Sequence, residues 1–218
     1  MPRTKRVLEP NRVYHVYNRR TDRQLLFPSS SAYDEFLDLL EDGCRRYGIR
    51  VCAYAVMPNH WHQAIWVREG SGARDTSNYL RRLSASHAIR FRHASRTRGN
   101  GHVYQDRFES LPVETEWHYL TLVRYIEANP LDAGLVRRAE EWRWSSLAER
   151  VSGVSRILSD GPVALPPDWV DIVNTRIATD PGGTEVRQAR DGGADLAGRR
   201  SKRSGTEVPA ATIIRANI

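Results

Sequence analysis

The sequence predicts an α+β fold with the element order βαββαβα and one four-stranded antiparallel sheet. Short runs rich in Val, Ile, Tyr and Trp alternate with longer segments whose apolar residues recur every three or four positions. The first six elements follow the split βαβ, ferredoxin-like pattern, which gives such a sheet with helices on one face. This fold class serves many unrelated functions, so function has to be inferred from particular side chains.

Composition narrows the class of protein. The 218 residues suffice for one domain with an appendage, and the net charge of +7 favours a polyanionic partner such as nucleic acid. Cys44 and Cys52, the two cysteines, form no CxxC pair, which argues against a disulfide scaffold and suits a reducing cytoplasm. No apolar run approaches the roughly 20 residues of a membrane span, so we expect a cytoplasmic protein without a membrane partner.

The N-terminal third predicts a strand followed by a helix. Residues 12–19 are rich in Val and Tyr and predict the first strand. Ser30 or Ser31 can cap the helix, and Gly48 ends it. Its apolar stripe consists of Tyr33, Phe36, Leu37, Leu40 and Cys44.

Four further elements precede residue 114. Residues 49–56 and 60–67 predict a hairpin, because Pro58 and the following Asn favour a turn between them. A second helix is expected over about 75–95, and 102–113 predicts a fourth, irregular strand.

The third helix is expected to start near residue 114 and to end by Asn129, because Pro130 disfavours helical conformation in the residue before it. The segment Trp142-Arg143-Trp144 follows. We expect it to pack a final turn onto the sheet, although its aromatic side chains could also stack on bases.

Three regions are predicted along the chain. Residues 1–150 form the main domain, 151–180 a C-terminal extension, and 181–218 a basic, flexible tail with few large apolar residues. The tail either adds nonspecific affinity for nucleic acid, which falls with salt, or is idle.

Two histidines in the second hairpin strand form the first candidate site. His60 and His62 would share one face of the strand, with Trp61 on the other. Neutral imidazoles bind divalent metals well. The spacing alone is equally compatible with two hydrogen-bonded structural side chains, and a metal site would need a third ligand.

The third helix offers that ligand. Tyr125 and Asn129 are four residues apart and therefore neighbours on one helical face. The amide oxygen of Asn129 suits magnesium or manganese, and the phenol of Tyr125 could attack a phosphorus atom beside such a metal. Alternatively, Tyr125 is an aromatic residue packed on the sheet with its hydroxyl at the edge.

Several blocks in order carry a family resemblance. They are Tyr14-His15-Val16, 55–62 (Ala-Val-Met-Pro-Asn-His-Trp-His), 104–108 (Tyr-Gln-Asp-Arg-Phe), 125–136 (Tyr-Ile-Glu-Ala-Asn-Pro-Leu-Asp-Ala-Gly-Leu-Val) and 142–146. With these blocks, residues 8–150 resemble the REP-associated tyrosine transposases, a branch of the IS200-like, single-tyrosine HUH transposases.

The resemblance implies an HUH nuclease fold, a Mg²⁺ or Mn²⁺ cofactor, and cleavage and joining of single-stranded DNA through a 5′-phosphotyrosine linkage. It also implies recognition of a DNA hairpin formed by a palindromic repeat. By position, His60 and His62 correspond to the HUH metal ligands, Tyr125 to the nucleophile and Asn129 to the third ligand, where many relatives have glutamine. Gln63 stands where an aliphatic residue is common, and we expect it to point away from the metal.

The stretch 71–110 holds eight arginines against three acidic residues, so it is a candidate for DNA backbone contact. The candidate residues are Arg81, Arg82, Arg90 and Arg92; for any one of them a solvated helix face is the alternative. Bound to DNA, the protein would be associated with the nucleoid. Because a single tyrosine permits one cleavage per site, joining two ends needs either a homodimer or reuse of one site.

Two other functions stay open. The chain could be a non-catalytic DNA-hairpin-binding protein or regulator that retains the HUH fold. A structural zinc protein is the third reading, although only two histidines cluster and no thiolates do. The sequence reveals neither the DNA target nor the activity in a cell.

Overall fold

The computed structural model describes residues 8–21, 24–70, 72–95 and 101–175, all within the first of two units of the chain, Met1–Ala178. The predicted tail 181–218 lies outside the described residues, and the domain boundaries at 150 and 180 remain predictions. None of the described helices is long and apolar enough to cross a membrane. The elements are β1 (Val13–Arg19), α1 (Ser30–Tyr47), β2 (Arg50–Met57), β3 (His60–Trp66), α2 (Gly72–Ala94), β4 (Glu109–Pro112), α3 (Glu116–Asp132), the 3₁₀ turn η1 (Ala139–Glu141), α4 (Ser146–Ser152) and α5 (Trp169–Asn174).

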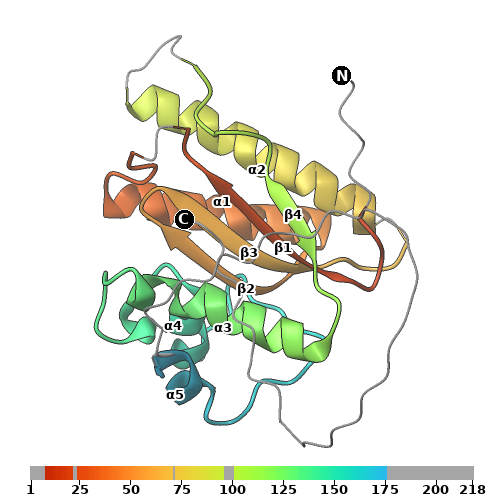
Figure 1. Cartoon of the computed structure of the whole chain (residues 1–218). Coiled ribbons are helices and arrows are strands. Elements are labelled where there is room, and N and C mark those ends of the chain that lie inside the picture. Colours follow the sequence, from red (N-terminus) through yellow and green to blue (C-terminus); the bar gives the residue numbers. More distant parts are fainter. Residues whose placement is uncertain (1–7, 22–23, 71, 96–100, 176–218) are drawn as a thin grey trace, which may run out of the picture. The chain divides into compact units, whose positions relative to one another are not determined.

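The four strands form one antiparallel sheet in the order β2-β3-β1-β4 (Figure 1). β1 is central, with Tyr17 opposite His62 of β3 on one side and opposite Glu109 of β4 on the other. β2 and β3 form the predicted hairpin, in which Met57 pairs with His60. The α+β class and the ferredoxin-like sheet are therefore confirmed.

The two faces of the sheet carry different helices (Figure 1). Trp61 and Ile65 of β3 belong to the core beneath α1 and α2, whereas Ala64 belongs to a second core with α3, α4 and α5. The prediction of helices on one face is thus correct for α1 and α2 and wrong for α3. The opposite face is also apolar, and its small residues, such as Ala53 and Ala55, let the backbone of α3 approach the sheet closely.

The ends of α1 follow the predicted chemistry with a small shift. The cap is Ser29 rather than Ser30 or Ser31, and its hydroxyl accepts a hydrogen bond from the backbone N–H of Ala32 at 3.3 Å. Gly48 ends the helix in the left-handed region, with φ +60°, as predicted from a glycine at this position.

The predicted end of α3 is wrong by three residues. The helix continues through Pro130 to Asp132, and the backbone N–H of Ala133 bonds to the carbonyl of Asn129 at 2.9 Å. Pro130 lies in the last turn, where it removes a single backbone hydrogen bond. Burial of Pro130 and Leu131 offsets the cost of that bond.

The fourth strand is shorter than the predicted 102–113. Only Glu109–Pro112 forms a regular strand, while Tyr104 makes an isolated bridge with Arg20. Residues 106–108 between these two pairings leave the ladder and interrupt the edge of the sheet.

The segment after α3 packs against β2 and α1. The indole N–H of Trp142 donates to the carbonyl of Val56 at 2.9 Å, and the ring of Trp144 stacks on Tyr33 with centroids 4.2 Å apart. These contacts confirm the packing role expected for Trp142 and Trp144.

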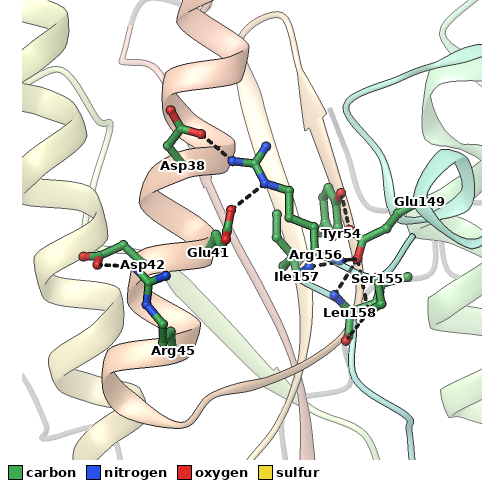
Figure 2. Close-up of polar contacts among 10 residues, drawn as sticks. All are labelled: Asp38, Glu41, Asp42, Arg45, Tyr54, Glu149, Ser155, Arg156, Ile157 and Leu158. Atoms are coloured by element: carbon green, nitrogen blue, oxygen red, sulfur yellow. Dashed lines mark hydrogen bonds and ion pairs between the residues drawn. The ribbon is translucent and has the colours of Figure 1, made fainter. Parts of the chain in front are cut away.

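Glu149 of α4 holds the loop that follows this helix through hydrogen bonds (Figure 2). Its carboxylate accepts hydrogen bonds from the hydroxyl of Tyr54 at 2.8 Å and from the backbone N–H groups of Ile157 at 2.8 Å and Leu158 at 2.9 Å. The guanidinium of Arg156 in the same loop binds the carboxylates of α1 residues Asp38 and Glu41. Residues beyond the predicted boundary at 150 are therefore held against β2 and α1.

Candidate active site

Strand β3 presents His60 and His62 on the face covered by α3. Their rings are 4.8 Å apart between centroids, and the residues are 5% and 4% exposed. Trp61 and Gln63 point to the opposite face, where the hydroxyl of Tyr79 donates to the amide oxygen of Gln63 at 2.8 Å. The expected orientation of Gln63 away from the histidines is confirmed.

Each histidine is held through its Nδ1 atom. Nδ1 of His60 lies 2.6 Å from the amide oxygen of Asn59, which can only accept, so this nitrogen carries the proton. Nδ1 of His62 lies 2.9 Å from Nε2 of His15. Donation by His62 to His15 gives His62 the same tautomer. Both Nε2 atoms then present lone pairs, as metal-binding histidines do.

Helix α3 places Tyr125 and Asn129 beside this pair. The ring of Tyr125 lies 5.6 Å from that of His62 between centroids, edge to face. Asn129 is 3% exposed, and its side chain lies close enough to His60 and Tyr125 to influence the pKa of both. The structure thus brings together the four predicted site residues from two elements more than 60 residues apart.

The four side chains share an unusual property. Nε2 of His60, Nε2 of His62, the hydroxyl of Tyr125 and Oδ1 of Asn129 are all buried without a hydrogen-bond partner within the described part of the chain. Buried polar atoms normally find partners, since an unpaired one costs about 1–3 kcal/mol. Their convergence therefore indicates a site built for a ligand.

Burial sets the protonation states of this cluster. It lowers the pKa of His60 to about 4, with a further contribution from the positive charge of Arg19, and it lowers that of His62 well below the usual value. Burial also raises the pKa of the Tyr125 phenol, while the Asn129 amide acts in the opposite direction. At neutral pH the imidazoles are neutral, ready to bind a cation, and Tyr125 is a phenol.

The donor set fits a divalent metal. Two imidazole nitrogens and one amide oxygen leave several coordination positions for water or a phosphate oxygen. Among the residues described, no group of three or more His, Cys, Asp or Glu side chains is arranged to hold a metal. The mixed donor set of His60, His62 and Asn129 is a candidate because its unpaired donor atoms converge.

Sequence reasoning missed the residues that support the histidines. His15 of β1 is 6% exposed and stacks on His62, and Tyr17 lies 5.7 Å from the same ring between centroids. Asn59 orients His60 from the turn. The signal for His15 and Tyr17 was their position two apart in a strand, but only the pairing of β1 with β3 brings them to the site.

A second missed group lies behind the histidines. The indole N–H of Trp61 donates to the hydroxyl of Tyr104 at 3.2 Å, and this hydroxyl lies 2.7 Å from Nδ1 of buried His87. Tyr104 thereby links β3 to α2 and holds the side chain of Trp61, the residue between His60 and His62 in the sequence.

The four predicted DNA-contact arginines all lie on α2 but do not share one surface. Arg81 and Arg92 line a groove of about 1160 Å³ between α2 and residues 102–109, whereas Arg82 and Arg90 are exposed outside it.

Comparisons with known proteins show the fold and the family. The model of the family described as "Transposase IS200 like" matches residues 10–129, more than half of the chain. Among curated protein sequences, none matches. A REP-associated tyrosine transposase solved with a bound REP hairpin is similar over 82% of this chain and 100% of that one, with 21% identity and a TM-score of 0.54. A crystal structure of a transposase described from Deinococcus radiodurans covers 58% of this chain and 96% of its own, with 20% identity and a TM-score of 0.39. The fold is thus that of the REP-associated enzyme, and the family match shows that this chain belongs to the IS200-like transposases.

Proposed function

We propose that this transposase cleaves and joins single-stranded DNA through a covalent bond between Tyr125 and a 5′ phosphate. The observation that carries the proposal is the convergence of four buried, unpaired polar atoms from His60, His62, Tyr125 and Asn129. Two supply imidazole lone pairs, one supplies an amide oxygen and one is a nucleophile, which together make the donor set of a metal-assisted phosphoryl transfer.

In this proposal His60, His62 and Asn129 hold a divalent metal, Mg²⁺ or Mn²⁺. The metal would polarise the scissile phosphate and offset the negative charge that develops on it. Asn59 and His15 keep the two imidazoles in the tautomer that the site requires, through contacts of 2.6 and 2.9 Å.

Tyr125 provides the nucleophile. Its phenolic oxygen forms a bond to phosphorus as the bond from phosphorus to the 3′ oxygen breaks. The phenol gives up its proton to solvent, and the departing 3′ oxygen takes up a proton from solvent and leaves as a hydroxyl. Attack of a 3′ hydroxyl on the phosphotyrosine reverses these changes and joins strands. Because α3 carries a single such tyrosine, two joined ends require either a second copy of the chain or a second use of the site.

The substrate in this proposal is DNA next to a palindromic hairpin. The structurally similar REP-associated transposase was solved bound to a REP hairpin, and the +7 net charge favours a polyanionic partner. Inverted palindromic repeats flanking the gene would supply the substrate sequence.

The test uses end-labelled single-stranded DNA carrying such a palindrome, incubated with protein and Mn²⁺ and resolved on a denaturing gel. Wild-type protein is expected to give a covalent shifted band and Tyr125→Phe none, with hairpin binding retained. Tyr47→Phe, a change in α1 away from the site, is the matched control and should keep the band. An adduct formed by Tyr125→Phe would overturn the assignment. Hairpin binding without any adduct from wild-type protein would instead favour the non-catalytic regulator.

A further inference from the structure

A groove of about 1160 Å³ runs along α2 on the face of the sheet opposite the candidate active site. One wall is α2 and the other is residues 102–109, and Asn18 of β1 also lines it. Its volume exceeds the roughly 300–1,000 Å³ of typical small-molecule pockets, so it suits an extended ligand.

The α2 wall has a regular pattern. Arg81, Ala85, Ala88 and Arg92 follow at helical spacing, which places the Cα atoms of the two arginines about 16 Å apart on one stripe with small residues between them. Among the described residues, neither arginine is paired with a carboxylate. The wall thus offers two cationic ends and an accessible middle.

Two other side chains on this wall are in surroundings that do not match their polarity. The Ser84 hydroxyl is buried without a hydrogen-bond partner within the described residues. Ile89 is 68% exposed, although it is a large apolar residue. A hydroxyl that can bond a phosphate or base edge, beside an apolar surface against which a base can lie, is typical of nucleic-acid grooves.

The opposite wall has mixed charge. Arg107 adds a cation, whereas Asp106 and Glu109 are carboxylates that would repel phosphates and accept hydrogen bonds from base amino groups. This asymmetry would orient a bound strand with its backbone against α2 and its base edges toward residues 102–109. A single strand can present its backbone to one wall and its unpaired bases to the other.

The groove and the candidate active site lie on opposite faces of the same strand, β1. Asn18 lines the groove, while its neighbour Tyr17 lies on the other face of β1, 5.7 Å from the ring of His62 between centroids. At this level residues 106–108 interrupt the edge of the sheet. A strand leaving the groove can therefore turn around the edge toward Tyr125.

We propose that this groove binds the single-stranded DNA adjoining the cleavage site, with phosphates on Arg81 and Arg92 and bases beside Ile89. The proposal rests on the proposed function, because it assigns the path of that enzyme's substrate. It also separates the four arginines of α2 into two that contact the strand, Arg81 and Arg92, and two that do not, Arg82 and Arg90.

The test compares Arg81→Gln/Arg92→Gln with Arg82→Gln/Arg90→Gln, which remove the same charge from the same helix. Both are made in Tyr125→Phe protein, and binding of a short fluorescein-labelled single strand of mixed sequence is followed by anisotropy without divalent metal. The groove variant is expected to bind at least tenfold more weakly, and its plot of log affinity against log salt should be shallower by about 1.4, since two phosphate contacts are lost. The control variant should stay within about threefold of the parent. Ser84→Ala should weaken binding about two- to tenfold.

An equal loss of affinity in both double variants, or no loss in either, would overturn the assignment of this groove to DNA binding. Circular dichroism melting of each variant checks that the exposed substitutions leave the fold intact. Because binding is measured without metal and without Tyr125, the result does not depend on cleavage. Failure of the proposed function would leave the difference between the two variants in place, whereas failure of the groove would leave adduct formation by wild-type protein in place.

Discussion

Replacement of His15 by Phe tests how the metal-ligand candidates are positioned. Nε2 of His15 lies 2.9 Å from Nδ1 of His62, and the residue is 6% exposed. Phe retains a planar ring of similar size next to Tyr17 and Tyr125, but it removes the hydrogen-bond acceptor. His62 is then free to rotate or to adopt the tautomer with a proton on Nε2, which has no lone pair on Nε2 to bind a metal.

The expected loss follows from the role of such outer partners. Removing a group that orients a metal-binding histidine typically lowers metal affinity about 10- to 100-fold, or roughly 1.4–2.7 kcal/mol. The buried Nδ1–H of His62 also loses its acceptor, which should lower the free energy of unfolding by about 1–3 kcal/mol.

Isothermal titration calorimetry of Mn²⁺ measures the first effect, with Tyr125→Phe protein as the parent so that no cleavage intervenes. His15→Phe in this parent should bind Mn²⁺ 10- to 100-fold more weakly. His93→Gln, at the exposed C-terminal end of α2, is the matched control and should bind as the parent does. Unchanged Mn²⁺ affinity in a folded His15→Phe protein would refute the positioning role.

Three further predictions concern stability. Tyr104→Phe leaves the buried indole N–H of Trp61 without its acceptor and should lower the free energy of unfolding by about 1–3 kcal/mol in urea denaturation; an unchanged midpoint would contradict the link. Burial lowers the pKa of His87 to about 4, and the nearby positive charge of Arg90 adds to this effect. Below about pH 6.5 His87 is therefore protonated in the unfolded chain, whereas in the folded chain it stays neutral down to about pH 4. In EDTA, stability should therefore fall between pH 6.5 and 4, with up to about 3 kcal/mol from His87, and a flat profile would contradict this. Glu127→Ala leaves Arg150 without its buried carboxylate and should cost about 3–5 kcal/mol by the same assay, whereas a cost below 1 kcal/mol would show that the pair is dispensable.

Local spacing predicted which side chains of the candidate site lie together on each element. Alternation along a strand placed His60 and His62 on one face, and four-residue spacing on a helix placed Tyr125 beside Asn129. These relations depend on the geometry of one element at a time. That the strand and helix meet was inferred from chemistry, because only neighbouring donors make a site.

The partners of the histidines depend on long-range pairing. His15 reaches His62 only because β1 pairs with β3 in a register that sets Tyr17 opposite His62. One residue of slip would turn His15 to the other face. Sequence reasoning without strand register could not choose between these arrangements.

Packing decided the other differences from expectation. Pro130 ends many helices, but here the burial of Pro130 and Leu131 keeps the last turn of α3 helical. Arg81 and Arg82 are consecutive arginines that the sequence does not distinguish. The rotation of α2 about its axis relative to the sheet places Arg81, and not Arg82, in the groove.

The central claim is that Tyr125 becomes covalently bonded to DNA. The most direct measurement is mass spectrometry of protein incubated with Mn²⁺ and a palindrome-bearing single strand, then digested with protease and nuclease. The account predicts a nucleotide adduct on the peptide that contains Tyr125, and its loss when His60 and His62 are replaced by alanine. An adduct on another tyrosine, or an undiminished adduct on Tyr125 in the absence of both histidines, would contradict it.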